Sequence, residues 1–184
     1  MGHDKALLPW RGGTFLSNAI EALQPYTELI IVVAGENEAN VAPIVYAHAA
    51  YLVTNPHPEN GQFSSLKIGL ESVLNRGRDA AIVTLVDRPA PTLETVEYLK
   101  NEFQRNDEQV WAVVPEYDGK HGHPIVIGRE MIEHFLRAPA GSTARDVEHA
   151  LQPHVRYVPV ADALVAVNIN TPADFEHLHI GQTS

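Results

Sequence analysis

Short runs of apolar residues alternate along the chain with stretches in which apolar residues recur at helical spacing. The three strongest runs each end at a glycine, an acidic residue or a proline, and they cover residues 29–34, 80–86 and 110–114. Weaker candidate strands cover residues 50–54, 124–127, 155–160 and 163–169. Runs that are apolar on both faces are typical of strands in a parallel sheet that is covered by helices.

Between these runs, five segments place apolar residues at the spacing of an amphipathic helix. They cover residues 15–23, 64–74, 92–103, 130–136 and 143–151. In the third segment Val96 and Leu99 show this spacing, and Thr92 is placed to cap the helix. Alternating strands and helices predict an α/β fold with an open, doubly wound sheet. Ligands of such folds bind beyond the carboxyl ends of the strands, so the loops there are the candidate sites.

Length, composition and charge narrow the class of protein. The chain has 184 residues, which corresponds to about one domain. It contains no cysteine, and this excludes a disulfide framework, a thiolate zinc site and a cysteine nucleophile. Its formal net charge of -10 argues against nucleic acid as a partner. No apolar run reaches the ~18 residues that span a bilayer, and no signal-peptide layout is present, so we expect a cytoplasmic protein without a membrane partner.

Two loop segments contain candidate contacts to a nucleotide. Lys5, close to Gly2 and ahead of an apolar stretch, could reach phosphates with its flexible ammonium, or it could belong to an ordinary solvated terminus. Residues 55–67 begin with two prolines, a glycine and asparagine, which predict a rigid loop. Ser64 or Ser65 then opens a helix whose N–H groups could hold an anion or a ribose, although Ser64 could equally be a plain helix cap.

Asp87 and Asn168 are the candidate ligands of a metal ion. Asp87 lies where a buried strand meets its carboxyl-end loop, which is a usual place for a magnesium-binding carboxylate beside a nucleotide. The alternative is a structural aspartate that accepts hydrogen bonds from loop amides. Thr171 is expected to cap a helix with Pro172 at its first position, which does not explain Asn168. The amide oxygen of Asn168 could join Asp87 on a metal ion.

Residues 119–124, Gly-Lys-His-Gly-His-Pro, predict a polar loop that approaches a ligand closely. Its two histidines raise the question of zinc, but no helical His-Glu-x-x-His motif and no obvious third ligand accompany them. We favour contact with an anion or a heterocycle over a metal, and a plain hairpin turn is an equal alternative. Residues 141–145, Gly-Ser-Thr-Ala-Arg, add a helix start with one usable cation, Arg145.

Five motifs, taken in their order and spacing, are more specific than any of them alone. They read Met-Gly-x-x-Lys-x-Leu-Leu-Pro-Trp, Asn-Pro-x-x-x-x-Gly-x-x-x-Ser-Leu, Asp-x-Pro, Gly-His-Pro and Asn-x-Asn-Thr-Pro-x-Asp. The set resembles the MobA-like nucleotidyltransferase family, most closely its molybdenum-cofactor cytidylyltransferase branch. The resemblance implies a single domain over residues 1–184 with a Rossmann-like nucleotidyltransferase fold. This fold, of the nucleotide-diphospho-sugar transferase type, has a mostly parallel sheet with helices on both faces.

The resemblance also implies a function. It is the magnesium-dependent (Mg2+) transfer of a nucleoside monophosphate, CMP or alternatively GMP, from CTP or GTP to the phosphate of molybdopterin (molybdenum cofactor), with release of pyrophosphate. A recipient molybdoenzyme is a further implied partner. There are two alternatives to this function. The protein could be a nucleotidyltransferase that acts on another small phosphorylated acceptor, or a non-catalytic relative that only binds nucleotide or cofactor. A metal ion and a lysine suit this chemistry, because they neutralise the repulsion between attacking phosphate and leaving pyrophosphate.

By the same resemblance, Lys5 and Asp87 are the expected catalytic residues. Lys5 would neutralise the nucleotide phosphates, and Asp87 would be the principal magnesium ligand with Asn168 as a second contact. The expected nucleotide-binding residues are Gly2, Lys5, Gly61, Ser64 and Ser65. The expected acceptor-binding residues are Gly122, His123, Pro124 and, on the acceptor phosphate, Arg145.

The sequence departs from the family pattern in two places. The family opens with a buried strand and a Gly-rich loop that ends in Arg-Met-Gly, and this sequence begins at that Met-Gly. We therefore expect the domain to lack its usual first strand, and the neighbours of that strand to present unpaired backbone groups. The last motif reads Asn-Ile-Asn, which is more similar to the guanylyl branch than to the cytidylyl branch. The choice between CTP and GTP therefore stays open.

Overall fold

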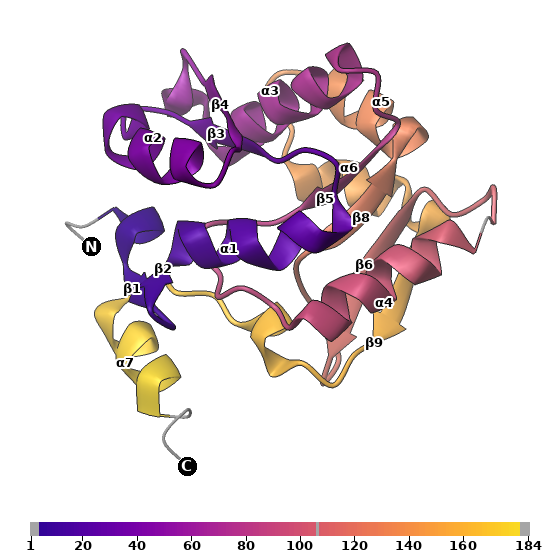
Figure 1. Ribbon diagram of the computed structural model, residues 1–184. Helices are drawn as coiled ribbons and strands as arrows, with labels where there is room; N and C mark the ends of the chain where they lie inside the picture. Colours follow the sequence, from indigo (N-terminus) through magenta and orange to yellow (C-terminus); the bar gives the residue numbers. More distant parts are fainter. Residues whose placement is uncertain (1–3, 106, 181–184) are drawn as a thin grey trace.

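The computed structural model describes residues 4–105 and 107–180, and its strands form two main sheets that are covered by helices (Figure 1). The first sheet consists of β3 (Ile31–Ala34) and β4 (Tyr51–Thr54). The second consists of β5 (Ala80–Val83), β8 (Ile125–Gly128), β6 (Ala112–Tyr117), β7 (Lys120–His121) and β9 (Val155–Pro159). A short separate hairpin joins β1 (Pro9–Trp10) and β2 (Gly13–Thr14).

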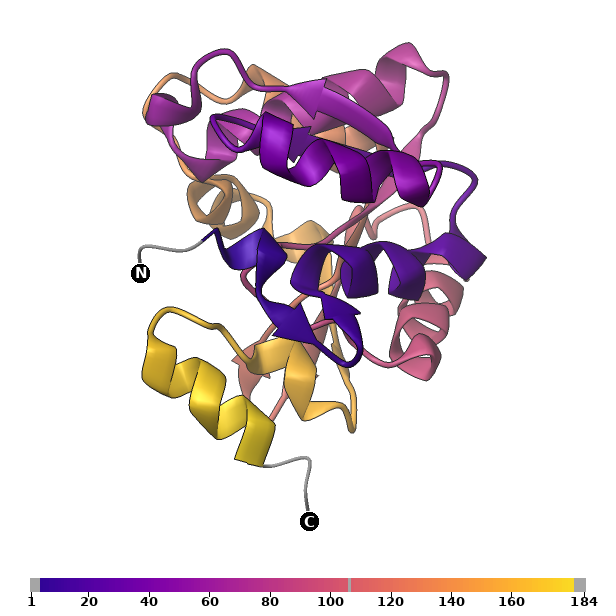
Figure 2. The ribbon, with the colours of Figure 1, turned by 60° about the vertical axis from the view of Figure 1, so that its left-hand side comes forward.

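Helices cover both faces of the sheets. The α-helices of the described residues are α1 (Phe15–Leu23), α2 (Glu38–Ala47), α3 (Gln62–Asn75), α4 (Leu93–Gln104), α5 (Arg129–Arg137), α6 (Ala144–Ala150) and α7 (Pro172–Ile180). The 3-10 helices are η1 (Lys5–Leu7), η2 (Gln24–Tyr26), η3 (Pro58–Asn60), η4 (Gln152–His154) and η5 (Ala163–Ala166). Helix α1 packs against α2 and α4, whereas α5 packs against α3 and α6. Figures 1 and 2 show α7 beside the β1–β2 hairpin, and Phe175 of α7 contacts Phe15 directly after that hairpin.

Most strands run in the same direction. β3 and β4 are parallel, and so are β6 and β9, whereas β8 is antiparallel to both of its neighbours, β5 and β6. β5 therefore runs parallel to β6. The carboxyl ends of β3 and β5 also lie together, because Asn37 donates a 2.8 Å hydrogen bond to Asp4 and the adjacent Lys5 lies 3.7 Å from Asp87. The predicted α/β fold with a mostly parallel sheet and helices on both faces is confirmed.

The buried side chains come from the apolar faces that the sequence indicates. Met131, Ile132 and Phe135 of α5 have no exposed surface and pack with Leu70 of α3 on one face of the second sheet. On the opposite face Leu99 of α4 packs against that sheet. A separate cluster joins α1 and α2 to the first sheet. Burial of these apolar areas, at about 25 cal/mol per Å2, holds each helix layer on its sheet.

Several local predictions are confirmed at the level of single residues. Helix α1 covers residues 15–23 as predicted, and Thr92 caps α4 by accepting a 3.3 Å hydrogen bond from the Thr95 N–H. Thr171 likewise accepts a 3.1 Å bond from the Asp174 N–H at the start of α7. The alternative that Ser64 caps its helix is wrong. Helix α3 begins two residues earlier with Gly61 at its N-cap, and the Ser64 hydroxyl donates a 2.7 Å bond to the Gly61 carbonyl.

Two elements differ from the sequence pattern. The predicted strand over residues 163–169 is wrong, because its first half forms η5. Asp162 starts that turn by accepting a 3.0 Å hydrogen bond from the Leu164 N–H. Helix α2 has no counterpart among the predictions, since Pro43 lies inside it and proline normally argues against a helix interior.

No described helix is both long and apolar enough to cross a lipid bilayer.

The two main sheets do not join. Within the described residues β3 pairs with β4 and β5 pairs with β8, and no strand lies between β3 and β5. The residues Ile31, Val32 and Val33 are only half-buried, although the sequence pattern places them inside a sheet. Helix α1 lies across the middle of the molecule between the two sheets (Figure 1).

Candidate active site

Lys5 and Asp87, the two expected catalytic residues, lie close together beyond the carboxyl end of β5. The Lys5 Nζ lies 3.7 Å from Asp87 Oδ2 and donates a 3.4 Å hydrogen bond to Asn170 Oδ1. Asp4 holds Lys5 in place, because its carboxylate caps η1 at the Ala6 N–H. The Lys5 and Asp87 side chains are 29% and 23% exposed, so both remain accessible to a ligand.

Asp87 presents an oxygen that the described residues leave unused. Its Oδ1 is buried and has no hydrogen-bond partner in the described part of the chain. The Asp87 carbonyl accepts a 3.0 Å bond from the Ile169 N–H, which fixes the segment with Asn168 and Asn170 next to this loop. Ile169 is buried, whereas both asparagines are exposed. An unpartnered carboxylate oxygen with amide oxygens nearby is chemically suited to magnesium, which takes oxygen ligands from one or two carboxylates and its substrate.

The histidines of residues 119–124 do not form a zinc site with other described residues. No group of three His, Cys, Asp or Glu side chains in residues 4–105 and 107–180 is arranged to hold a metal ion. His121 forms a 3.2 Å contact with Glu116 and stacks on Tyr157. Asp118 and Gly119 both have positive φ between paired strands β6 and β7, so the hairpin alternative is confirmed for this part of the segment.

His123 is hydrogen-bonded to the carbonyl oxygen of Val165, and Gly122 lies directly against that carbonyl. The His123 N–H donates to it at 3.0 Å, and a Cβ on Gly122 would overlap it, so only glycine fits there. Arg88, the residue after Asp87, donates to the same carbonyl at 3.3 Å and to that of Val167 at 3.4 Å. These bonds join the loop after β5 to the segment before β8. They place Gly122 and His123, two of the predicted acceptor-binding residues, near the loop that contains Arg88 and Asp87.

His123 and Arg88 form a polar pair at this junction. Burial, and to a smaller extent the nearby Arg88 cation, lower the pKa of His123 from 6.5 to about 4. Burial also lowers the pKa of Arg88, although Asp87 opposes that effect. In the described part of the chain neither His123 Nδ1 nor Arg88 Nε has a hydrogen-bond partner. A neutral imidazole and a cation are thus both available to a polar ligand.

The buried Asn55 side chain holds the start of α3 through hydrogen bonds to two serines. This side chain is 2% exposed, and its Nδ2 donates 2.9 Å hydrogen bonds to the hydroxyls of Ser64 and Ser65. Gly61 has φ +84° and ψ 175°, a conformation that side-chain-bearing residues avoid. A Cβ at Gly61 would meet no atom within 4 Å. Glycine is therefore favoured at this position by its backbone conformation and not by crowding, and the open space next to it can accommodate a ligand.

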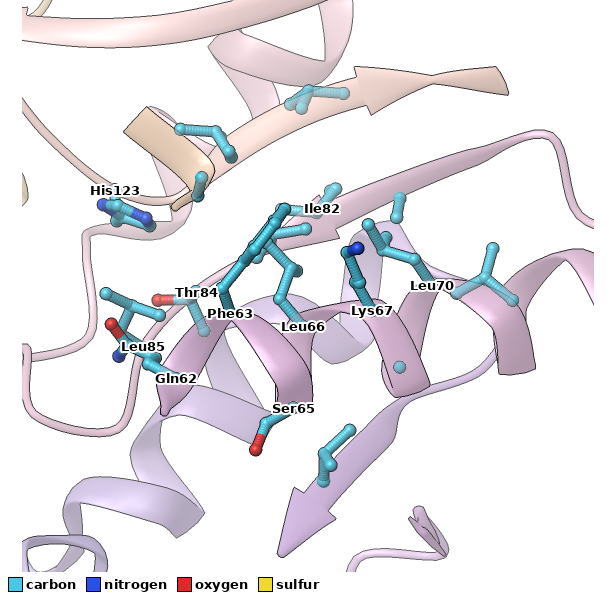
Figure 3. Close-up of a pocket in the computed structure, with 18 of the residues that line it drawn as sticks. Gln62, Phe63, Ser65, Leu66, Lys67, Leu70, Ile82, Thr84, Leu85 and His123 are labelled. Carbon is cyan, nitrogen blue, oxygen red and sulfur yellow. The ribbon is translucent and has the colours of Figure 1, made fainter. Parts of the chain in front are cut away.

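Most of the predicted nucleotide-binding and acceptor-binding residues line one cleft of about 1930 Å3. Its lining includes Gly61, Ser64, Ser65, Gly122, His123 and Arg145. Figure 3 shows His123 near Thr84 and Leu85, with Phe63 and Ile82 further along the cleft. Ser65 points away from them, in agreement with its bond to Asn55.

The cleft does not include every predicted residue. Lys5, Asp87, Asn168 and the buried Pro124 are not part of its lining, whereas Arg88 is, so the Lys5–Asp87 pair borders the cleft through Arg88. Arg145 is exposed at the start of α6. The predicted contact at Gly2 lies outside the described residues.

Sequence reasoning missed Arg88, Asn170 and Asn55. Arg88 occupies the variable position of Asp-x-Pro, and only tertiary burial makes it a contact. Asn170 alternates with the buried Ile169, so a two-residue period could have placed it on the same side as Asn168. Asn55 directly follows β4, and its position at a carboxyl strand end was an available signal.

Comparison with solved structures identifies the fold. Rv0371c from Mycobacterium tuberculosis H37Rv matches with a TM-score of 0.78 at 20% identity, covering 97% of this chain and 90% of that one. Its manganese complex matches with a TM-score of 0.77 at 20% identity, covering 95% and 90%. A nucleotidyl transferase from Methanothermobacter thermautotroptrophicus matches with a TM-score of 0.77 at 22% identity, covering 98% and 86%. These similarities show the fold of nucleotidyltransferases.

The family follows from the sequence comparisons. The model of the MobA-like NTP transferase domain matches residues 1–155, so this chain belongs to that family and is a nucleotidyltransferase. The molybdenum cofactor cytidylyltransferase of Escherichia coli (strain K12) is 28% identical over 95% of this chain and 86% of its own length. The molybdenum cofactor guanylyltransferase of Xanthomonas euvesicatoria pv. vesicatoria (strain 85-10) is 28% identical over 97% and 87%.

Proposed function

We infer that this nucleotidyltransferase transfers a nucleoside monophosphate, CMP or alternatively GMP, from the triphosphate to the phosphate of molybdenum cofactor. The observation that carries the proposal is the Lys5–Asp87 pair at the carboxyl end of β5, with Asp87 Oδ1 buried and unpartnered. Relatives with cytidylyl and guanylyl names are equally similar in identity, and this leaves both nucleotides in the proposal.

The chemistry needs charge neutralisation rather than a protein nucleophile. A phosphate oxygen of the acceptor forms a bond to the α-phosphorus, and the bond to the β-phosphate breaks, so that pyrophosphate leaves with its electron pair. Lys5 neutralises charge on the nucleotide phosphates and is itself positioned by Asp87 and Asn170. Magnesium, when bound, supplies further charge neutralisation of the phosphates. Asp87, with Asn168 beside it, offers the oxygen atoms that would hold it.

The cleft separates the two substrates in this proposal. Gly61, Ser64 and Ser65 at the start of α3 are the nucleotide side, where Asn55 fixes the two hydroxyls. Gly122, His123, Pro124 and Arg145 are the acceptor side. His123 is neutral at pH 7 because burial lowers its pKa, so it can hydrogen-bond a heterocycle without adding charge. Arg88 contributes a cation between the two sides.

A transfer assay tests the proposed function. Pyrophosphate release and the dinucleotide product are measured with molybdenum cofactor, magnesium and either CTP or GTP. We expect Asp87→Asn to lower the rate by roughly 100-fold or more, because an amide binds magnesium less well than a carboxylate. Asp118→Asn is the matched control, since Asp118 is in an exposed turn with φ 50° that asparagine tolerates. Equal rates in Asp87→Asn and the parent would contradict the proposal.

A further inference from the structure

Helix α6 directs a set of polar side chains into the cleft. Arg145, Glu148 and His149 line the cleft, whereas Val147 and the C-cap residue Leu151 pack against the hydrophobic core. This division follows the helical period, since residues three and four positions apart share one face of a helix. The polar face of α6 therefore forms one wall of the cleft.

The start of α6 is held in place by hydrogen bonds. The Thr143 hydroxyl accepts a 3.2 Å bond from the Asp146 N–H, and Asp146 Oδ2 accepts a 2.8 Å bond from the Thr143 N–H. Lys67 of α3 donates a 2.6 Å bond to the carbonyl of Ala138, in the segment that leads into α6. Side chains on the cleft face of α6 are therefore positioned before a ligand binds, which lowers the entropic cost of binding.

Glu148 is a half-buried carboxylate without a partner. None of the described residues forms a hydrogen bond or an ion pair with it. Burial raises the pKa of Glu148, and the more distant basic groups of His121, His149 and Arg145 only partly oppose this effect. Ionised Glu148 is therefore less favourable in the folded chain than in the unfolded chain. A residue that lowers stability in this way is more readily explained by binding than by folding.

Two stacked rings lie near this carboxylate. The rings of His121 in β7 and Tyr157 in β9 are 13° from parallel, with centroids 3.8 Å apart, and both residues line the cleft. Burial and the charge of Glu148 both raise the pKa of Tyr157, so the carboxylate and the rings are neighbours. His121 Nε2 lies 3.2 Å from Glu116 Oε2, which orients the exposed imidazole. The cleft thus contains a flat stacking surface beside an unpaired carboxylate.

This combination favours a flat heterocycle that carries two adjacent N–H donors. A heterocycle stacks on aromatic side chains whatever hydrogen-bonding groups it carries. An ionised carboxylate, in contrast, accepts two hydrogen bonds and donates none. It binds a ring N–H and a neighbouring amino group together, and it repels a carbonyl group in the same place. Pterin has this pair of donors, because its amino group is next to a ring N–H.

We propose that Glu148 determines acceptor specificity: its carboxylate accepts hydrogen bonds from the amino group and the adjacent ring N–H of a pterin, which stacks beside His121 and Tyr157. The inference rests on the proposed function, because it assigns a subsite to the pterin part of that acceptor. Gly122 and His123 directly follow His121, and their contacts with the Val165 carbonyl connect this subsite to the loop after β5.

Binding of two small probes, without nucleotide or magnesium, tests this proposal. Pterin has the amino group, and lumazine has the same ring system with a carbonyl in its place. In a fluorescence titration we expect the parent protein to bind pterin at least about tenfold more tightly than lumazine. Glu148→Gln should lose this preference, because an amide can donate to the carbonyl of lumazine. Equal affinities of the parent for both probes, or an unchanged preference in Glu148→Gln, would overturn the proposal.

Two other variants separate recognition of the donors from stacking. Glu108→Gln removes a carboxylate from an exposed position outside the cleft lining, and it should keep the preference for pterin. His121→Ala should weaken the binding of both probes by a similar factor, because stacking does not depend on the donor pattern. His121→Phe restores an aromatic ring and should recover the affinity. Loss of the pterin preference in Glu108→Gln would show that net charge, and not Glu148, sets it.

Unfolding in urea at pH 7 shows whether Glu148 has a structural role instead. Its pKa is raised in the folded protein, so at a pH above both pKa values its ionisation lowers the free energy of unfolding. Glu148→Gln removes this effect and should be at least as stable as the parent. A clearly less stable Glu148→Gln variant would assign the side chain to the fold and overturn its role in recognition.

The transfer reaction gives a second measurement. With molybdenum cofactor as acceptor, Glu148→Gln should raise the KM for the acceptor at least about tenfold and leave kcat unchanged, because the pterin is remote from the reacting phosphate. Lower kcat with unchanged KM would contradict this role. Pterin preference without any transfer would refute the proposed reaction and leave this subsite standing. Transfer with an unchanged acceptor KM in Glu148→Gln would refute the subsite and leave the reaction standing.

Discussion

The Lys5 ammonium lies 3.7 Å from Asp87 Oδ2, although one residue is near the start of the chain and the other follows β5. Lys5 contacts only Oδ2 of this carboxylate, and the other oxygen, Asp87 Oδ1, has no hydrogen-bond partner among the described residues. Buried polar atoms normally have a hydrogen-bond partner. An oxygen without one, beside a lysine, suits the proposed site for a metal ion and phosphates.

Replacement of Lys5 tests the charge of this site. Lys5→Met removes the ammonium that neutralises phosphate charge in the proposed mechanism, and we expect kcat/KM for the nucleotide to fall by about 100-fold, or roughly 3 kcal/mol of transition-state stabilisation. Lys5→Arg keeps the charge and should lose much less. Steady-state kinetics at saturating acceptor measures both variants. Equal losses in the two variants would assign Lys5 a packing role instead.

Gly122 and Gly61 should respond differently to alanine. Gly122→Ala places a Cβ against the Val165 carbonyl, and we expect a loss of about 2–4 kcal/mol in the free energy of unfolding. Gly61→Ala meets no atom within 4 Å and should lose only about 1 kcal/mol, from its φ of +84°. Urea unfolding of both variants gives the comparison. A smaller loss at Gly122 than at Gly61 would show that the loop moves away from Val165.

His123 predicts a specific dependence of stability on pH. Its pKa is lowered from 6.5 to about 4 in the folded protein, so between these pH values the unfolded chain binds a proton that the folded chain does not. The free energy of unfolding should therefore decrease as the pH falls from 6.5 to about 4, by on the order of 3 kcal/mol, and level off below.

His123→Gln provides the control for this titration. The variant should lose this part of the pH dependence, whereas His121→Gln should keep it because His121 is exposed. Urea unfolding at pH 4 to 7 and imidazole NMR shifts are the measurements. An NMR titration of His123 near 6.5 would contradict the expected burial of its charge.

Much of the fold follows from local patterns in the sequence. Residues 15–23 and Thr92 carry apolar spacing and capping signals that act within a few residues, and the structure contains those elements. The segment after Asp162 forms η5 rather than a strand, because Asp162 caps it locally at the Leu164 N–H and is itself held by the distant Thr92 N–H. The helix around Pro43 forms because Val41 and Val45 pack in the cluster that joins α1 and α2 to the first sheet. Tertiary packing overrides local propensity at such places.

The candidate site was predictable in its polar residues but not in its connections. The motifs singled out Lys5 and Asp87 as candidates, and the structure places the two side chains 3.7 Å apart. The bonds of Arg88 to the carbonyls of Val165 and Val167 depend on a contact between segments more than seventy positions apart. The side on which Ser65 points also depends on Asn55, a buried side chain from another element.

The most direct test of the central claim is a thermal shift of the protein with CTP and with GTP, each with and without magnesium. At about 100 times its dissociation constant, a nucleotide should stabilise the protein by roughly 2.7 kcal/mol, and the shift should require magnesium. The base that gives the larger shift identifies the nucleotide, and Asp87→Asn should lose the magnesium-dependent part. A shift that is unchanged by magnesium or by Asp87→Asn would contradict a magnesium–nucleotide site at Lys5 and Asp87.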